Sequence, residues 1–142
     1  VPAPRNGNQT NVRQGAALFE QLECAKCHIP KQKTGSGNAI SALNNQTIFP
    51  YSDLLLHDMG EGLADNRPDF LASGSEWKTR PLWGIGLTQL INGHTDFLHD
   101  GRARNIQEAI LWHGGEAQNA KNKYKQLSAQ QRSDLLAFIN SL

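Results

Sequence analysis

Five consecutive residues, from Cys24 to His28, constrain this chain more than any other stretch. They read Cys-Ala-Lys-Cys-His and contain both cysteines of the 142-residue sequence. Cys-x-x-Cys-His is the pattern at which haem is attached covalently in c-type haem proteins. Each thiol can add to one vinyl group of the haem, and the adjacent histidine can bind the iron as its proximal ligand. The motif therefore predicts one haem c, attached through Cys24 and Cys27 and bound by His28.

Two other functions of a Cys-x-x-Cys motif fit this sequence less well. A redox-active cysteine pair normally follows a β-strand in a βαβ unit, but the residues before Cys24 have a helical pattern. A zinc site needs a histidine pair or a second Cys-x-x-Cys at a suitable spacing, and the sequence contains neither.

The composition is consistent with one small domain built around a cofactor. A chain of 142 residues fits a single domain, and an apolar content of 38% is low for a self-sufficient core. A buried porphyrin would supply further apolar surface. The net charge of +1 gives no reason to expect nucleic acid as a partner, and the longest apolar run, 135–139, is too short for a membrane span. Because haem attachment implies export, we expect a periplasmic protein, present as a mature chain or a fragment.

The hydrophobic pattern predicts an all-α fold. Residues 1–10 are expected to form a linker or tail, and a helix is expected from Asn11 up to Cys24, with Gly15 where another helix could approach closely. A short helix is predicted after Ser52, with Leu55, Leu56 and Met59 facing inward and Gly60 at its end. Residues 61–80 are expected to be irregular, and 81–87 to form an apolar loop packed against a large flat surface.

Two further helices are predicted in the C-terminal part. The first starts at Asn105, where Asn105 and Glu108 resemble a capping box, and it ends near His113. The second starts at Ser128, which forms a capping box with Gln131, and it buries Leu135, Phe138, Ile139 and Leu142. No strand is predicted. We therefore expect residues 11–142 to form a cytochrome c-like single domain wrapped around one haem.

The second axial ligand has two candidates. His113 lies on the apolar face of its predicted helix and is followed by two glycines, so its imidazole would point inward at a helix end. The alternative role for His113 is a core histidine bonded to a backbone carbonyl. Met59 is the only methionine and could bind iron through its thioether. Core packing is the commoner role of methionine, and Met59 comes early in the chain for a distal ligand.

Other polar and aromatic residues have possible roles around a haem. His57 could bind a haem propionate or a surface group, and His94 and His99 lie in a polar loop, where His99 beside Asp100 is expected to be a hydrogen-bonded anchor. Guanidinium groups suit carboxylates, which makes three arginines candidates for pairing with the propionates. Two tryptophans are expected to pack against the haem or in the core. These arginines and tryptophans are Arg80, Arg102, Arg104, Trp83 and Trp112.

Three segments resemble a known family. Arg80 to Thr88, Phe97 to Arg102 and Glu108 to Ala117 are similar to the C-terminal haem domain of the bacterial di-haem oxidoreductases, and Asp53 to Gly60 fits the same family. Members are also described as peroxidases or thiol oxidoreductases, and they are remotely similar to di-haem cytochrome c peroxidases. The resemblance, which runs from about residue 15 to the end, implies a distal ligand at the position of His113 and disfavours Met59.

The resemblance also implies a role within a larger protein. Family members have two haem domains, whereas this chain has a single Cys-x-x-Cys-His motif. The expected function is electron entry through a six-coordinate, bis-histidine haem, with a second haem domain or a redox protein as partner. An enzyme that reduces peroxide after its distal ligand dissociates is the alternative, and a gas-binding haem sensor is a third possibility.

Overall fold

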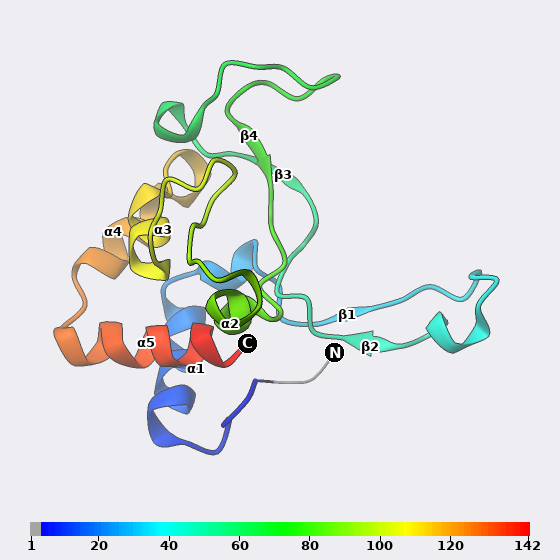
Figure 1. Cartoon of the computed structure of the whole chain (residues 1–142), viewed down its shortest axis with the longest axis horizontal. Helices are drawn as coiled ribbons and strands as arrows, with labels where there is room; N and C mark the ends of the chain where they lie inside the picture. Colours follow the sequence, from blue (N-terminus) through cyan, green and yellow to red (C-terminus); the bar gives the residue numbers. More distant parts are fainter. Residues whose placement is uncertain (1–3) are drawn as a thin grey trace.

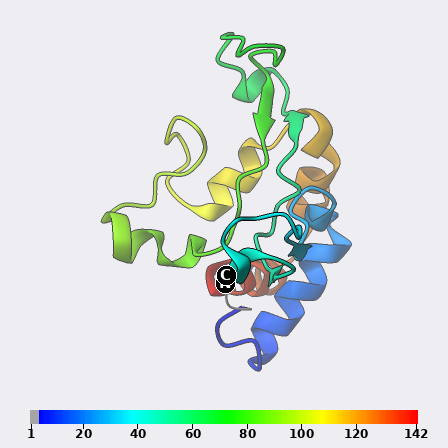
Figure 2. The same ribbon diagram turned by 90° about the vertical axis from the view of Figure 1, so that its right-hand side faces the viewer.

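The structure is a computed structural model that describes residues 4–142. The longest helices, α1 (Thr10–Gln21) and α5 (Ala129–Ser141), pack side by side (Figure 1). Helices α3 (Ile106–Trp112) and α4 (Gln118–Lys125) precede α5, and the short helix α2 (Thr88–Asn92) lies on the other side of the molecule from α1 (Figure 2). Among the described residues, no helix is long and apolar enough to cross a membrane.

Two small antiparallel sheets show that the expected all-α fold is wrong. Strand β1 (Gln32–Lys33) pairs with β2 (Thr47–Ile48) at the base of an arm that extends away from the helices (Figure 1). Strand β3 (Leu56–Asp58) pairs with β4 (Glu76–Lys78), with His57 opposite Trp77. Segments of two or three residues are too short to show a periodic hydrophobic pattern, which is why none of them was predicted.

The helix predicted after Ser52 is replaced by strand β3. Tyr51 and Leu54 have positive φ angles of 52° and 64°, which a right-handed helix does not allow. Ser52 is fully buried, and its hydroxyl donates to the carbonyl of Thr79 at 2.7 Å instead of capping a helix. Leu56 is 51% exposed, so the predicted inward face does not form.

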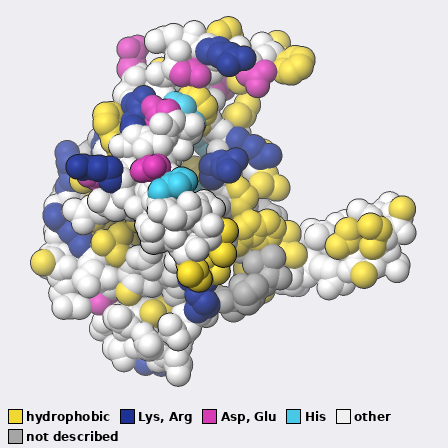
Figure 3. All heavy atoms as spheres, viewed as in Figure 1, with side chains coloured by type: hydrophobic (Ala, Val, Ile, Leu, Met, Phe, Trp, Pro, Cys, Tyr) yellow, Lys and Arg dark blue, Asp and Glu magenta, His cyan; other side chains and the backbone are white. Residues whose placement is uncertain are grey.

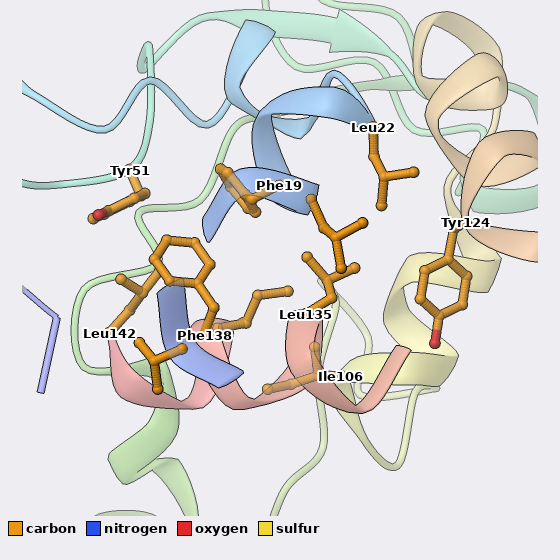
Figure 4. Close-up of a cluster of buried hydrophobic side chains, with 11 residues drawn as sticks. Phe19, Leu22, Tyr51, Ile106, Tyr124, Leu135, Phe138 and Leu142 are labelled. Atoms are coloured by element: carbon orange, nitrogen blue, oxygen red, sulfur yellow. The ribbon is translucent and has the colours of Figure 1, made fainter. Parts of the chain in front are cut away.

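The hydrophobic core lies where α1 crosses α5 (Figure 4). Phe19, Tyr51 and Phe138 point toward one another, with ring centroids 5.3–6.0 Å apart in edge-on arrangements. The buried stripe predicted for the last helix is confirmed, because Leu135, Phe138, Ile139 and Leu142 are all buried. The aromatic cluster also reaches the haem motif, since the rings of Phe19 and His28 lie 6.4 Å apart.

The helix starts predicted at Asn105 and Ser128 and the predicted close approach at Gly15 are confirmed. A β-carbon on Gly15 would lie only 2.0 Å from the carbonyl oxygen of Asp134, so α5 packs directly against the backbone of α1. Asn105 caps α3 by accepting from the amide of Glu108 at 2.9 Å. Ser128 and Gln131 form the reciprocal capping box at the start of α5.

The predicted linker lies partly outside the described residues, which start at residue 4. The backbone amide of Arg5 donates to the carbonyl of Ser141 at 2.7 Å, and its guanidinium donates to that of Asn140 at 2.8 Å. Arg5 therefore lies beside the end of α5 before α1 begins. The boundary at residue 10 stays a prediction.

Candidate functional site

The Cys24–His28 motif begins directly after α1. Glu23 adopts a positive φ of 67° and ends the helix, and a short 3-10 turn over Cys24–Lys26 follows. The amide of His28 donates to the carbonyl of Cys24 at 3.0 Å, which closes the motif into a compact turn. Both thiols are free and project from this one turn.

Burial raises the pKa of the Cys24 thiol to about 11, and it also raises the pKa of Cys27. Both cysteines are therefore protonated at neutral pH. A redox-active Cys-x-x-Cys pair depends on a thiolate stabilised by a lowered pKa. The environment of these thiols thus argues against a redox pair, as the sequence pattern does.

The His28 imidazole is held in the orientation expected of a metal ligand. Its Nδ1 lies 3.0 Å from the carbonyl oxygen of Tyr51, so Nδ1–H donates there and Nε2 keeps its lone pair. Burial lowers the pKa of His28 to about 4, which keeps the ring neutral at physiological pH. A hydrogen bond from the second ring nitrogen to a carbonyl is the usual support of a metal-bound histidine.

The His113 imidazole is held in the same way. It follows α3 directly, and its Nδ1 lies 2.7 Å from the carbonyl oxygen of Ala109. Burial lowers the pKa of this ring as well. The pKa of His28 is lowered first by burial, is raised by the hydrogen bond to Tyr51, and is lowered again by repulsion from a charge on His113. Each imidazole thus uses Nδ1 for a backbone carbonyl and leaves its Nε2 for a ligand.

The alternative distal candidate, Met59, comes close to the same place. Its backbone carbonyl would lie 2.8 Å from a β-carbon on Gly114, the residue after His113. Its amide donates to the carbonyl of Ser75 at 2.9 Å. The fold thus brings both predicted distal candidates to one region, although they are 54 positions apart in the sequence.

Large apolar side chains around these segments remain exposed. Leu111 and Trp112 precede His113 and are about two-fifths exposed, as is Trp83. Hydrophobic side chains also gather on the face beside the base of the β1–β2 arm and at its tip (Figure 3). So much exposed apolar surface on a small domain indicates that something apolar covers part of it. Together with two free thiols and two neutral imidazoles, these residues fit a haem.

Two of the three candidate propionate-binding arginines already have protein partners. Arg102 pairs with Asp100 at 2.6 Å and lies 4.9 Å from the centre of the Trp112 ring, and Arg104 pairs with Glu108. Arg80 is exposed, and none of the described residues forms an ion pair with it. Arg80 thus remains the candidate with a free guanidinium.

The remaining histidines differ in their surroundings. The ring of His99 stacks on Trp77 at 3.7 Å and 14°, so it contacts β4 by stacking, whereas the expected anchor was a hydrogen bond. His94 is exposed beside Asp96. His57 lies between two carboxylates, with Nε2 2.8 Å from Asp53 and Nδ1 2.9 Å from Glu116. This cluster was not predicted, because only the spacing of four between Asp53 and His57 indicates it in the sequence, and Glu116 is 59 positions from His57.

This cluster lies beside the haem motif. The sulfur of Cys27 is 3.9 Å from Nδ1 of His57, and ligand atoms of Cys27, Asp53 and His57 lie within 4.8 Å of one another. A structural zinc site takes four ligands, usually with deprotonated cysteines. Here both imidazole nitrogens are occupied by carboxylates, and the Glu116 bond is the main cause that raises the pKa of His57. The arrangement therefore fits a hydrogen-bond network better than a metal site.

Comparison with known proteins identifies the family. The family model described as "Di-haem oxidoreductase, putative peroxidase" matches residues 1–142, the whole chain, including the first ten residues. No curated protein and no solved structure matched. The description of this family names haem binding and oxidoreductase activity. On the strength of a match over its full length, the chain belongs to the di-haem oxidoreductases.

Proposed function

We propose that this chain is an electron-transfer domain with one haem c, attached through Cys24 and Cys27 and bound axially by His28 and His113. The observation that carries the proposal is the matched state of the two imidazoles. Each is neutral, each donates from Nδ1 to a backbone carbonyl, and each keeps Nε2 for the iron. A haem iron supplies one-electron chemistry between its ferric and ferrous states.

Cys24 and Cys27 would hold the haem through thioether bonds. Each S–H would add across one vinyl double bond, with sulfur bonded to one carbon and hydrogen to the other, so the addition needs no oxidant or reductant. Cys24 and Cys27 lie in one turn, so both thiols could reach the same edge of the cofactor. We further propose a periplasmic location and a second haem domain or redox protein as partner, in keeping with the di-haem family.

Two axial histidines favour electron transfer over catalysis, because they leave the iron without an open position for a substrate. Bis-histidine ligation should also give a lower reduction potential than histidine–methionine ligation. The family description supports a peroxidase as the second candidate, in which His113 would leave the iron on reduction. A gas sensor would share that open position in its ferrous state.

The decisive experiment is absorption spectroscopy of the haem-loaded protein in both redox states, with and without carbon monoxide. We expect a low-spin haem that binds carbon monoxide slowly, without the long-wavelength band of a methionine–iron bond. His113→Ala should become high-spin, whereas the matched variant Met59→Leu should keep the wild-type spectrum. A low-spin six-coordinate spectrum in His113→Ala, or a high-spin Met59→Leu, would rule out the proposed ligation. Turnover of peroxide far faster than by free haem would favour the peroxidase.

A further inference from the structure

A continuous chain of hydrogen bonds links the two halves of the proposed haem site. It runs from Asp53 through His57 to Glu116, with Asp53 Oδ2 2.8 Å from His57 Nε2 and His57 Nδ1 2.9 Å from Glu116 Oε2. The central imidazole and Asp53 are mostly buried, whereas Glu116 is about half exposed. Hydrogen bonds that join an imidazole to carboxylates are among the stronger ones in proteins.

The Asp53 end of this chain is fixed to the proximal segment. The backbone amide of Asp53 donates to the carbonyl of Cys27 at 2.8 Å, and the neighbouring amide of Ser52 donates to the carbonyl of Ile29 at 3.0 Å. These two bonds bracket His28, the proposed proximal ligand. A second oxygen of Asp53 accepts from the amide of Leu55 at 2.9 Å, which fixes the carboxylate itself.

The Glu116 end is fixed to the distal segment. Glu116 follows His113 by three residues, and its Oε1 accepts from the backbone amide of Asp58 in β3 at 2.9 Å. Between them, Gly114 and Gly115 lie directly on the backbone around β3. A β-carbon on Gly115, where φ is 49°, would come within 2.1 Å of the Asp58 carbonyl oxygen. The two glycines therefore permit close contact between the His113 segment and the backbone around β3, and the hydrogen bond from Asp58 to Glu116 stabilises this contact.

We propose that His57 and Glu116 are positioning residues, which hold the His113 segment against the proximal segment and so determine how readily an outside ligand displaces His113. Neither residue touches the iron in this proposal. The inference rests on the proposed bis-histidine ligation, because the segment that His57 and Glu116 hold in place carries the proposed distal ligand, His113. It also replaces the expectation that His57 binds a propionate, since both of its ring nitrogens are already occupied.

The test measures carbon monoxide binding to the reduced, haem-loaded chain, together with the ferric spin state. Glu116→Ala and His57→Ala should each bind carbon monoxide at least about tenfold faster than the wild type, because loss of a hydrogen bond to a charged group shifts a local equilibrium by that order. Both variants should also show a high-spin ferric fraction. Glu61→Ala, which removes an exposed acid that forms no ion pair within residues 4–142, is the matched control and should behave as the wild type.

A conservative variant separates positioning from charge. In Glu116→Gln the amide oxygen can still accept from Asp58, and its N–H can donate to Nδ1 of a neutral His57, so the wild-type rate should be retained. If the alanine variants do not fold, Glu116→Asp provides the measurement, because its shorter side chain keeps the charge but cannot reach both partners. It should also bind carbon monoxide faster than the wild type.

The outcomes distinguish this inference from the proposed function. Equal carbon monoxide rates in the wild type and His113→Ala would overturn the bis-histidine ligation and the inference together. A fast His113→Ala variant combined with folded, haem-loaded Glu116→Ala and His57→Ala variants at the wild-type rate would overturn only the positioning role. If neither Glu116→Ala nor His57→Ala folds, a wild-type carbon monoxide rate in Glu116→Asp would likewise overturn only the positioning role.

Discussion

His28 and His113 reach the same chemical state by different routes. His28 lies in a loop after a 3-10 turn and donates to a carbonyl 23 residues later, whereas His113 ends a helix and donates to the carbonyl one turn before it. Burial lowers the pKa of both rings, so neither has to lose a proton before it can bind a metal. Pre-oriented, neutral imidazoles would reduce the free-energy cost of forming the proposed six-coordinate site.

A single glycine sets the distance between the two main helices. Gly15→Ala should destabilise the fold by about 1–3 kcal/mol or more, because the added methyl would overlap the backbone of Asp134 and cannot be relieved by a side-chain rotation. Urea denaturation of the haem-loaded protein measures the loss. Gly37→Ala is the matched control, since its β-carbon would meet nothing within 4 Å. Equal losses in the two variants would contradict this role of Gly15.

At the scale of elements, the helix starts follow local chemistry. Ser128→Ala should lower the stability of the fold by about 1 kcal/mol, because the serine hydroxyl accepts from the amide of Gln131 at 3.2 Å and nothing replaces it. The effect should show as a lower urea midpoint with an unchanged slope. Ser36→Ala, in the exposed arm, removes a hydroxyl away from any helix and should leave the midpoint where it is.

The same scale shows where prediction from sequence ends. Asn105 and Ser128 cap the helices that they were predicted to cap, because a cap depends only on residues within one turn. Strand β3 depends instead on its pairing with β4, some 20 residues later, and on the left-handed conformations of Tyr51 and Leu54. Leu55, Leu56 and Met59 were predicted to form the inward face of a helix, but the tertiary pairing of β3 with β4 overrode that preference.

At the scale of the whole molecule, Glu23 joins the haem motif to the C-terminal helices. Hydrogen bonds from Lys26, then from Lys123 and Asn119, lower the pKa of Glu23 to about 2, and the last two residues belong to α4. A carboxylate with a lowered pKa stabilises the folded state above its unfolded pKa of 4.5, and this contribution is lost as the pH falls toward 2.

Glu23→Gln should therefore melt at a lower temperature than the wild type at pH 6, and this gap should close as the pH approaches 2. The comparison is a series of thermal melts across that pH range, made on the haem-loaded protein. Glu61→Gln serves as the control because Glu61 is exposed and has no ion pair among the described residues. A gap that persists unchanged down to pH 2 would show that charge is not the cause.

By itself the sequence determined the Cys24–His28 pattern, the caps at Asn105 and Ser128 and the apolar stripe of α5, because each depends on residues within a few positions of one another. The sequence also indicated His113, through its place at the end of an amphipathic helix. Only the tertiary structure brought Glu116 to His57 across 59 positions, paired β3 with β4, and placed Met59 against Gly114. Such contacts depend on how the whole chain packs, so neither the local hydrophobic periodicity nor the spacing of residues within a motif predicts them.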